Sequence, residues 1–216
     1  MPGILQQIRF RAAKALYDGF FIIMMRDASW QEPLFAAIAP EANSRVLNFG
    51  PGSVSTARNL AIRFPTANIV AADPNAKAIE TPHGIIARRN IPNLRIIEAR
   101  RHGRLPFDAS SFDKVVLVLT LHDCPPGEKL AIAKEMRRVL RRGGTLHVAD
   151  YDKPATRRER AILRFTEYIS GRSAAEPHID GSWTAFLAKG GFVSICRQSS
   201  HSVGIGRISI VKAKKL

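Results

Sequence analysis

The chain has 216 residues, of which 45% are apolar and 24% charged, enough for one domain with a sizeable core. This apolar content excludes a disordered chain, and no apolar run approaches the roughly 18 residues that span a bilayer. Two cysteines are too few for a disulfide scaffold. The N-terminus lacks the basic start and cleavage site of a signal peptide, so we expect a soluble, cytoplasmic protein.

The charge of the chain is strongly positive. Lys and Arg number 33 against 18 Asp and Glu, which gives a formal net charge of +15. A field of this sign favours anionic partners such as nucleic acid, an acidic membrane surface or phosphorylated metabolites. An arginine-rich surface that is merely solvated is the alternative, and the charge by itself predicts nothing about the fold.

The hydropathy pattern divides the chain into an N-terminal helical lid segment, residues 1–44, and a domain of alternating strands and helices, residues 45–216. Strands are expected at residues 45–49, 68–72, 94–98, 114–119, 145–149, 192–198 and 205–212. Helices are expected at residues 53–63 (with Ser53 as N-cap), from about 75, and at 128–140, 155–170 and 182–189. This alternation predicts an α/β protein with a doubly wound, mostly parallel, seven-stranded sheet.

The turn between the first strand and the first helix carries the sequence NFGPGS, residues 48–53. Glycines there let a ligand approach the backbone, and the first strand–helix turn of an open α/β sheet is where nucleotide-like ligands bind. Asp73 ends the second strand, where a carboxylate accepts the two hydroxyls of a ribose. Ser55 replaces the third glycine of the dinucleotide fingerprint, which weakens a nicotinamide or flavin interpretation. A tight turn with a capping Asp is the structural alternative.

Four segments, in this order, resemble the motifs of the class I S-adenosylmethionine-dependent methyltransferases. They are residues 46–53 (VLNFGPGS), 69–74 (IVAADP), 105–116 (LPFDASSFDKVV) and 135–144 (EMRRVLRRGG). Within that class the chain is most similar to the ubiquinone/menaquinone-type C-methyltransferases and the small-molecule or lipid methyltransferases. The resemblance implies a Rossmann-like methyltransferase fold, S-adenosyl-L-methionine as cofactor, and methyl transfer to a small or lipid-like acceptor.

The resemblance also implies three groups of cofactor-binding residues. The methionine part would lie against Asn48, Gly50, Pro51 and Gly52. The ribose and adenine would lie against Asp73, Pro74 and Asn75. The sulfonium would lie above Leu119, Thr120 and Leu121.

Two positions depart from the family pattern. Asn48 stands where the family usually carries an acid, so it keeps a hydrogen bond but loses the attraction to the ammonium group. Arg100 and Arg101 fall where an acid or amide commonly binds the adenine, and arginine offers no acceptor. With the alignment shifted by two residues, Glu98 takes that role. These departures leave open a protein that binds the nucleoside, or nothing, without catalysis.

Candidate catalytic residues follow the fourth expected strand, where residues of this fold face the transferred methyl group. The pKa of a histidine suits His122 to act as a general base, and Asp123 would orient His122 or the substrate. Alternatively, His122 packs against or caps the next helix. Candidates for the edge of the acceptor pocket are Asp150 and Tyr151, which end the fifth expected strand, together with Tyr17 and His178. The histidines and cysteines never fall into ligand spacing, so we predict no metal site.

Three arginine-rich stretches, residues 88–104, 134–142 and 153–164, raise the question of a partner. A nucleic-acid methyltransferase is one alternative, but the chain lacks an Asn/Asp-Pro-Pro-aromatic motif and aromatic residues make up only 7%. An anionic membrane fits better, because the first expected helix is basic and amphipathic and leads into the apolar residues 20–25. The principal prediction remains transfer to a small or lipid-like acceptor; the oligomeric state is left open.

Overall fold

A computed structural model of the chain describes residues 19, 28–74, 91–100, 103–170, 172–204 and 206–216. Tyr17 and Asn75 lie outside the described residues, as do most of the expected N-terminal helical segment and the helix expected from about residue 75.

A seven-stranded sheet forms the centre of the protein, in the order β3-β2-β1-β4-β5-β7-β6. The strands are β1 (Arg45–Phe49), β2 (Asn68–Asp73), β3 (Leu94–Glu98), β4 (Phe112–Val118), β5 (Leu140–Tyr151), β6 (Val193–Val203) and β7 (Gly206–Lys214). Strands β1 to β5 are parallel to one another, and β7 is antiparallel to both β5 and β6. The predicted α/β fold with a mostly parallel sheet is therefore confirmed. Strand order reverses between β1 and β4, so a crevice is expected at their carboxyl ends.

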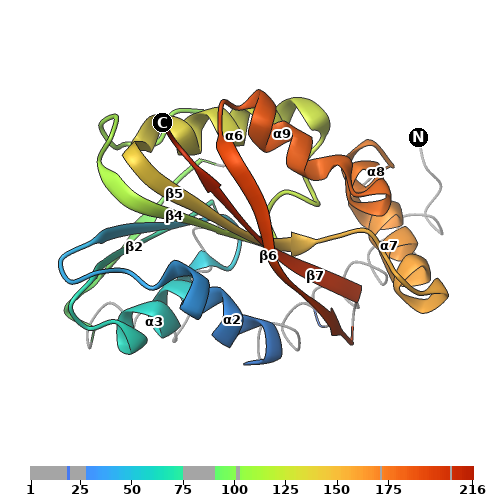
Figure 1. Ribbon diagram of the computed structural model, residues 1–216, viewed down its shortest axis with the longest axis horizontal. Helices are drawn as coiled ribbons and strands as arrows, with labels where there is room; N and C mark the ends of the chain where they lie inside the picture. The colour runs from blue at the N-terminus through green and yellow to red at the C-terminus, as the bar shows by residue number, and fades with distance from the viewer. Residues whose placement is uncertain (1–18, 20–27, 75–90, 101–102, 171, 205) are drawn as a thin grey trace, which may run out of the picture.

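Helices cover both faces of this sheet (Figure 1). They are α2 (Ala28–Ile38), α3 (Ser53–Arg63), α6 (Pro126–Val139), α7 (Arg157–Ser170), α8 (Arg172–Asp180) and α9 (Ala185–Lys189), with a short 3-10 helix η1 (Ser182–Thr184). α2 and α3 lie on one face and α6 and α9 on the other, with α7 and α8 at the end of the molecule beyond β5 and β7 (Figure 1). Among the described residues, no helix has the length and apolarity required to cross a membrane.

Two apolar clusters, one on each face, hold the layers together. On the α2–α3 face, Trp30 and Leu60 are completely buried against strand residues such as Val116. On the α6–α9 face, Met136 and Trp183 are completely buried in the same way. Because both faces are covered, the central strands are continuous apolar runs rather than alternating ones.

Several boundaries differ from those expected. The helix expected at residues 128–140 is α6, but the strand expected at residues 145–149 begins earlier: β5 starts at Leu140, so Gly143 and Gly144 lie within a strand. The prediction of Ser53 as an N-cap is also wrong. Gly52 takes that position with a φ of 76°, and no side chain caps the helix. A residue with a positive φ is preferentially glycine, which explains Gly52 at the N-cap. The backbone angle of this residue could not be predicted from the sequence pattern.

One further helix was not expected. α8 contains Pro177, and a proline normally ends or kinks a helix, so residues 172–180 were not predicted to be helical. Contacts with the rest of the fold hold it in place. Ala174 and Ala175 are buried, and His178 is completely buried with its Nδ1 2.6 Å from the Tyr151 carbonyl. Tertiary packing thus overrides the local preference.

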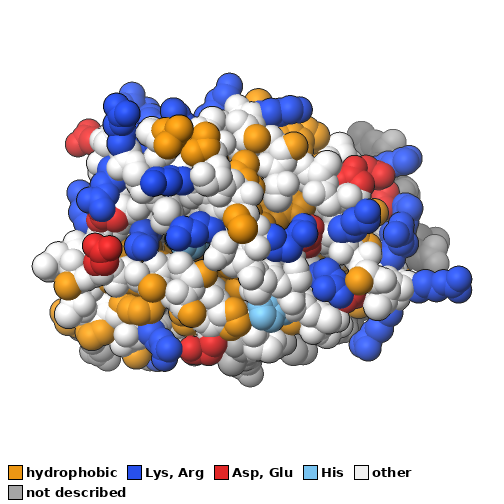
Figure 2. Space-filling model, viewed as in Figure 1, with side chains coloured by type: hydrophobic (Ala, Val, Ile, Leu, Met, Phe, Trp, Pro, Cys, Tyr) orange, Lys and Arg blue, Asp and Glu red, His pale blue; other side chains and the backbone are white. Residues whose placement is uncertain are grey.

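Positive charge is distributed widely on the surface. Figure 2 shows Lys and Arg side chains spread over the viewed face, with Asp and Glu in few places. The excess of 33 basic over 18 acidic residues is therefore visible as a broad field rather than as one patch on this face.

We expect Gly50→Ala to destabilise the protein. Gly50 has a φ of 126°, and a Cβ there would lie 2.1 Å from Thr120 Oγ1. Backbone strain and overpacking together cost about 3 kcal/mol, which urea unfolding followed by circular dichroism would measure. Gly127→Ala is the matched control, because a Cβ at Gly127 meets nothing within 4 Å. Equal stabilities of the two variants would contradict this prediction.

Candidate cofactor and acceptor site

The turn after β1 is shaped by polar contacts with its neighbours. Asn48 Nδ2 donates to the Ser53 carbonyl at 2.9 Å, and the Gly52 N–H donates to Asp73 Oδ2 at 2.9 Å. Asp73, at the carboxyl end of β2, is completely buried. Its side chain therefore points toward the glycine turn rather than outward.

Asn48 leaves one buried acceptor without a partner. Because its Nδ2 donates to the Ser53 carbonyl, the amide orientation is set and Oδ1 is the remaining group. Among the described residues Oδ1 has no hydrogen-bond partner, although buried polar atoms are normally paired. An acceptor at this turn fits the ammonium group of S-adenosylmethionine. Asn48 thus still presents a hydrogen-bond acceptor where the family usually carries an acid.

The ends of β1 and β4 meet at Thr120. Its hydroxyl lies 3.0 Å from the Val118 carbonyl and 3.4 Å from the Phe49 carbonyl, and it occupies the space beside Gly50. Leu119 has a φ of 48°, a left-handed conformation that is strained for leucine. Strain of this kind persists only where surrounding contacts enforce it, so the turn after β4 must be held from outside.

Asp150, which was expected with Tyr151 at the edge of the acceptor pocket, holds this turn. Its Oδ2 accepts hydrogen bonds from the backbone N–H groups of Thr120 at 3.0 Å and Leu121 at 2.7 Å, and Oδ1 accepts from the Tyr151 N–H at 2.8 Å. Burial alone would raise the pKa of Asp150, but His122 above all, with His178 and the Leu121 N–H, holds it well below its usual range. The sequence placed Asp150 at the end of the fifth expected strand, but its contacts with the turn after β4 were not predicted.

His122 lies between two carboxylates. Its Nδ1 is 2.9 Å from Asp150 Oδ1 and its Nε2 is 3.3 Å from Asp123 Oδ1. The His122 side chain is 1% exposed, whereas that of Asp123 is 29% exposed. Burial disfavours a charged imidazole, yet the two carboxylates outweigh this effect and raise the pKa of His122 above its ordinary value.

Lys129 lies beneath the same turn and is completely buried. Its Nζ donates to the carbonyls of Leu121 at 2.6 Å, Cys124 at 2.5 Å and Ala174 at 2.8 Å. It therefore joins the β4–α6 loop to α8. Burial lowers the pKa of Lys129 to about 8.

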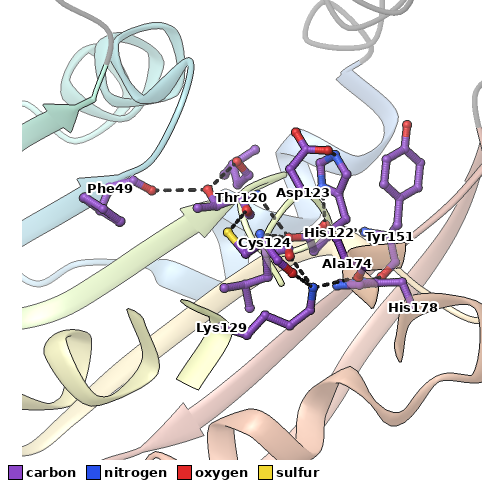
Figure 3. Close-up of polar contacts among 12 residues, drawn as sticks. Phe49, Thr120, His122, Asp123, Cys124, Lys129, Tyr151, Ala174 and His178 are labelled. Carbon is purple, nitrogen blue, oxygen red and sulfur yellow. Dashed lines mark hydrogen bonds and ion pairs between the residues drawn. The ribbon is translucent and has the colours of Figure 1, made fainter. Parts of the chain in front are cut away.

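Tyr151 and His178, both expected at the acceptor pocket, lie beside His122. The rings of Tyr151 and His178 have centroids 4.8 Å and 6.3 Å from that of His122. Figure 3 shows the side chains of Asp123, His122 and Tyr151 extending to the same side, while Lys129 lies on the opposite side of the loop. His178 stacks on Trp183, and burial lowers its pKa to about 4, so its imidazole is neutral at pH 7.

The remaining predicted residues lie near the carboxyl edge of the sheet. Glu98 ends β3 and is in register with Asp73 on β2, and Pro74 follows Asp73 directly. Leu119, Thr120 and Leu121 are each at most 1% exposed. The four ends of β1, β2, β4 and β5 thus bring together a glycine turn, a buried carboxylate and a polar cluster that lie far apart in the sequence.

Comparisons with known proteins relate this chain to methyltransferases. A family model described as a methyltransferase domain matches residues 46–144. A ubiquinone/menaquinone biosynthesis C-methyltransferase from Sinorhizobium fredii is 27% identical over 194 residues, which cover 83% of this chain and 72% of that protein. A demethylmenaquinone methyltransferase from Thermotoga maritima is 26% identical over 132 residues, 61% of this chain, and the match spans only 54% of that protein.

Solved structures share the fold. A SAM-dependent methyltransferase from Aquifex aeolicus superposes with a TM-score of 0.63 at 16% identity, covering 86% of this chain and 89% of that one. Another from Methanosarcina mazei has a TM-score of 0.63 at 20% identity, covering 82% and 94%. Residues 46–144 of this chain therefore form a methyltransferase domain, and the chain has the fold of the S-adenosylmethionine-dependent methyltransferases.

Proposed function

We propose that the protein transfers a methyl group from S-adenosylmethionine to a small, quinone-like aromatic acceptor in its reduced, hydroxyl-bearing form. The similar proteins named as demethylmenaquinone or ubiquinone/menaquinone methyltransferases support a quinone-like acceptor. The observation that carries the proposal is the polar cluster of Asp123, His122 and Tyr151 at the end of β4 and β5, which extends to one side beside the strained turn. An acceptor bearing hydroxyl groups matches such a cluster.

S-adenosylmethionine, when bound, supplies a methyl group on a sulfonium that is its own leaving group. The protein then contributes mainly position and exclusion of water, which are worth about 7–11 kcal/mol in favourable cases. Asp73 would hold the ribose hydroxyls, Asn48 Oδ1 would accept from the ammonium, and Leu119 would border the reacting centre. Burial and neighbouring carboxylates raise the pKa of Tyr151, so its hydroxyl stays protonated and serves as a hydrogen-bonding group for the acceptor.

The proposed acceptor class is tested by a transfer assay. The protein is incubated with S-adenosylmethionine carrying a deuterated methyl group and with short-chain demethylmenaquinol, and the quinone product is analysed by mass spectrometry. We expect the labelled methyl group in the product. Menaquinol of the same chain length is the control, because its ring carbon already carries the methyl group. Binding of S-adenosylhomocysteine without transfer to demethylmenaquinol would contradict the acceptor class while leaving the family assignment intact.

A further inference from the structure

The outer face of α7 combines arginines with two exposed aromatic side chains. Arg157, Arg160 and Arg164 are exposed and, at 3.6 residues per turn, lie on the same side of the helix as Phe165 and Tyr168. Phe165 is 40% exposed and Tyr168 is 54% exposed. Among the described residues, four large apolar side chains are exposed, and two of them belong to this one helix face. The face is therefore both cationic and aromatic.

Contacts on the inner side of α7 fix the direction in which this face points. The Glu159 carboxylate is buried and accepts hydrogen bonds from the Ala155 N–H at 2.7 Å and the Ser202 hydroxyl at 2.8 Å. It also pairs with Arg207 of β7 at 3.3 Å. Leu163 is buried in the apolar cluster of the α2–α3 face. These contacts prevent the helix from rolling, so the arginines stay directed outward.

The stability of the helix does not account for these arginines. Arg157, Arg158 and Arg160 lie in the first turn of α7, where the partial positive charge of the helix dipole disfavours cations. In α6, by contrast, Arg137 and Arg138 lie in the last turn, where cations are favoured. Within the described part of the chain, none of the three α7 residues forms an ion pair. Their charge is thus available to an anionic partner.

The position of α7 relates this face to the functional site. Because α7 follows β5, it begins at the carboxyl edge of the sheet, the edge that carries the glycine turn and Asp73. Figure 1 shows α7 at the end of the molecule, and Figure 2 shows Lys and Arg side chains projecting from that end. A partner bound to α7 therefore lies at the same end of the protein as the site.

We propose that the outer face of α7 docks the protein on an anionic lipid bilayer. The guanidinium groups bind lipid phosphates while their apolar stems and the ring of Phe165 enter the interface. Tyrosine suits the same depth, because its ring is apolar and its hydroxyl remains hydrated. This inference goes beyond the proposed function, and docking would bring the protein to the phase that dissolves a lipid-soluble acceptor.

Two other partners fit this face less well. Positive charge is spread broadly over the protein, so charge alone selects no surface, and the exposed aromatic side chains make the difference. A nucleic acid would use the arginines but not an exposed Phe165 on a convex helix. A second copy of the chain would bring like charges together. The sequence predicted a membrane contact through residues 20–25, which lie outside the described residues, and α7 is a separate surface.

Co-sedimentation with vesicles tests the arginines. The vesicles contain equal parts of phosphatidylglycerol and phosphatidylcholine, at about 0.1 M salt. We expect the combined variant Arg157→Gln, Arg160→Gln and Arg164→Gln to lower the partition coefficient about 100-fold, because each basic residue at an anionic surface contributes about fivefold. Vesicles of phosphatidylcholine alone should bind the wild type no better than this variant. Equal binding of wild type and variant to the anionic vesicles would overturn the proposal.

A matched variant separates α7 from the general positive field. Arg95→Gln, Lys134→Gln and Arg142→Gln together remove the same charge from exposed positions on β3, α6 and β5. This control should bind the anionic vesicles within about threefold of the wild type, because charges far from the surface are screened. Both combined variants should bind S-adenosylhomocysteine as the wild type does, which shows that the fold is retained. A loss as large in the control as in the α7 variant would overturn the proposal.

A fluorescent probe tests the aromatic part of the face. Trp30 and Trp183 are completely buried, so a new exposed tryptophan reports its own surroundings. On addition of the anionic vesicles, we expect the emission of Phe165→Trp to move to shorter wavelength and to be quenched by brominated lipids. Ile62→Trp, at a 55% exposed position on α3, is the control and should show neither change.

Two results of these measurements would assign the face differently. An emission from Phe165→Trp that vesicles leave unchanged would overturn docking through α7, whatever the co-sedimentation shows. If the combined α7 variant lost affinity for a duplex oligonucleotide but bound vesicles as the wild type does, the face would belong to nucleic acid and the proposal would fall. Neither measurement requires the methyl acceptor, so failure of the proposed quinone-like acceptor would leave this test intact.

Discussion

Asp73→Asn is expected to weaken the binding of S-adenosylhomocysteine about 100-fold. The asparagine retains an oxygen to accept the Gly52 N–H, whose distance to Asp73 Oδ2 is 2.9 Å, so the glycine turn should survive. What is lost is the negative charge toward the ribose diol. Two charge-assisted hydrogen bonds are worth together about 3 kcal/mol, or roughly two powers of ten in Kd. Isothermal titration calorimetry measures the affinity directly.

A second carboxylate provides the control for this experiment. Asp113 lies near the start of β4, where it pairs with Arg141 at 2.7 Å, and so belongs to the opposite edge of the sheet. Asp113→Asn removes the same charge without touching the glycine turn, and it should bind S-adenosylhomocysteine as the wild type does. If both variants bind normally, the ribose is held by other residues and the assignment of Asp73 is wrong.

Lys129→Met is expected to lower the free energy of unfolding by about 3 kcal/mol at pH 7. The substitution leaves three buried carbonyls, those of Leu121, Cys124 and Ala174, without their donor. Each unsatisfied group costs about 1–3 kcal/mol, and removal of a buried charge offsets part of the sum. Urea denaturation of the two proteins measures the difference, and α8 should become less protected in hydrogen exchange.

The same substitution has a pH dependence with a definite sign. The pKa of Lys129 is about 8 in the folded protein, against 10.5 for an ordinary lysine. Between pH 8 and pH 10.5, Lys129 is protonated more often in the unfolded chain than in the folded protein. The free energy of unfolding of the wild type therefore increases as the pH rises through this range. The difference in the free energy of unfolding between wild type and Lys129→Met should therefore increase by about 2.5 kcal/mol from pH 7 to pH 10. Lys134→Met, an exposed position on the same helix, should show no such widening, and a constant gap for Lys129→Met would contradict the prediction.

Local sequence patterns were sufficient to predict most strands of the central sheet. Continuous apolar runs predicted β1 and β3 with their observed bounds and most of β2 and β4, and α3 was predicted at residues 53–63 as observed. These segments are determined by periodicity and by glycine or proline at their ends, which are properties of neighbouring residues. The start of β5 and the helix α8 were missed, because there glycines and a proline indicate breaks that tertiary packing overrides.

The sequence by itself determined the class of fold, the methyltransferase motifs and the candidate residues on either side of the cofactor turn. Only the tertiary structure decided how His122 is held, since Asp150 lies 28 positions away and meets it through the pairing of β4 with β5. It also decided that Lys129 is buried against three carbonyls rather than solvated on its helix. The physical reason is that burial and hydrogen-bond partners depend on neighbours in space. A side chain's charge state follows from those neighbours and not from its position in the chain.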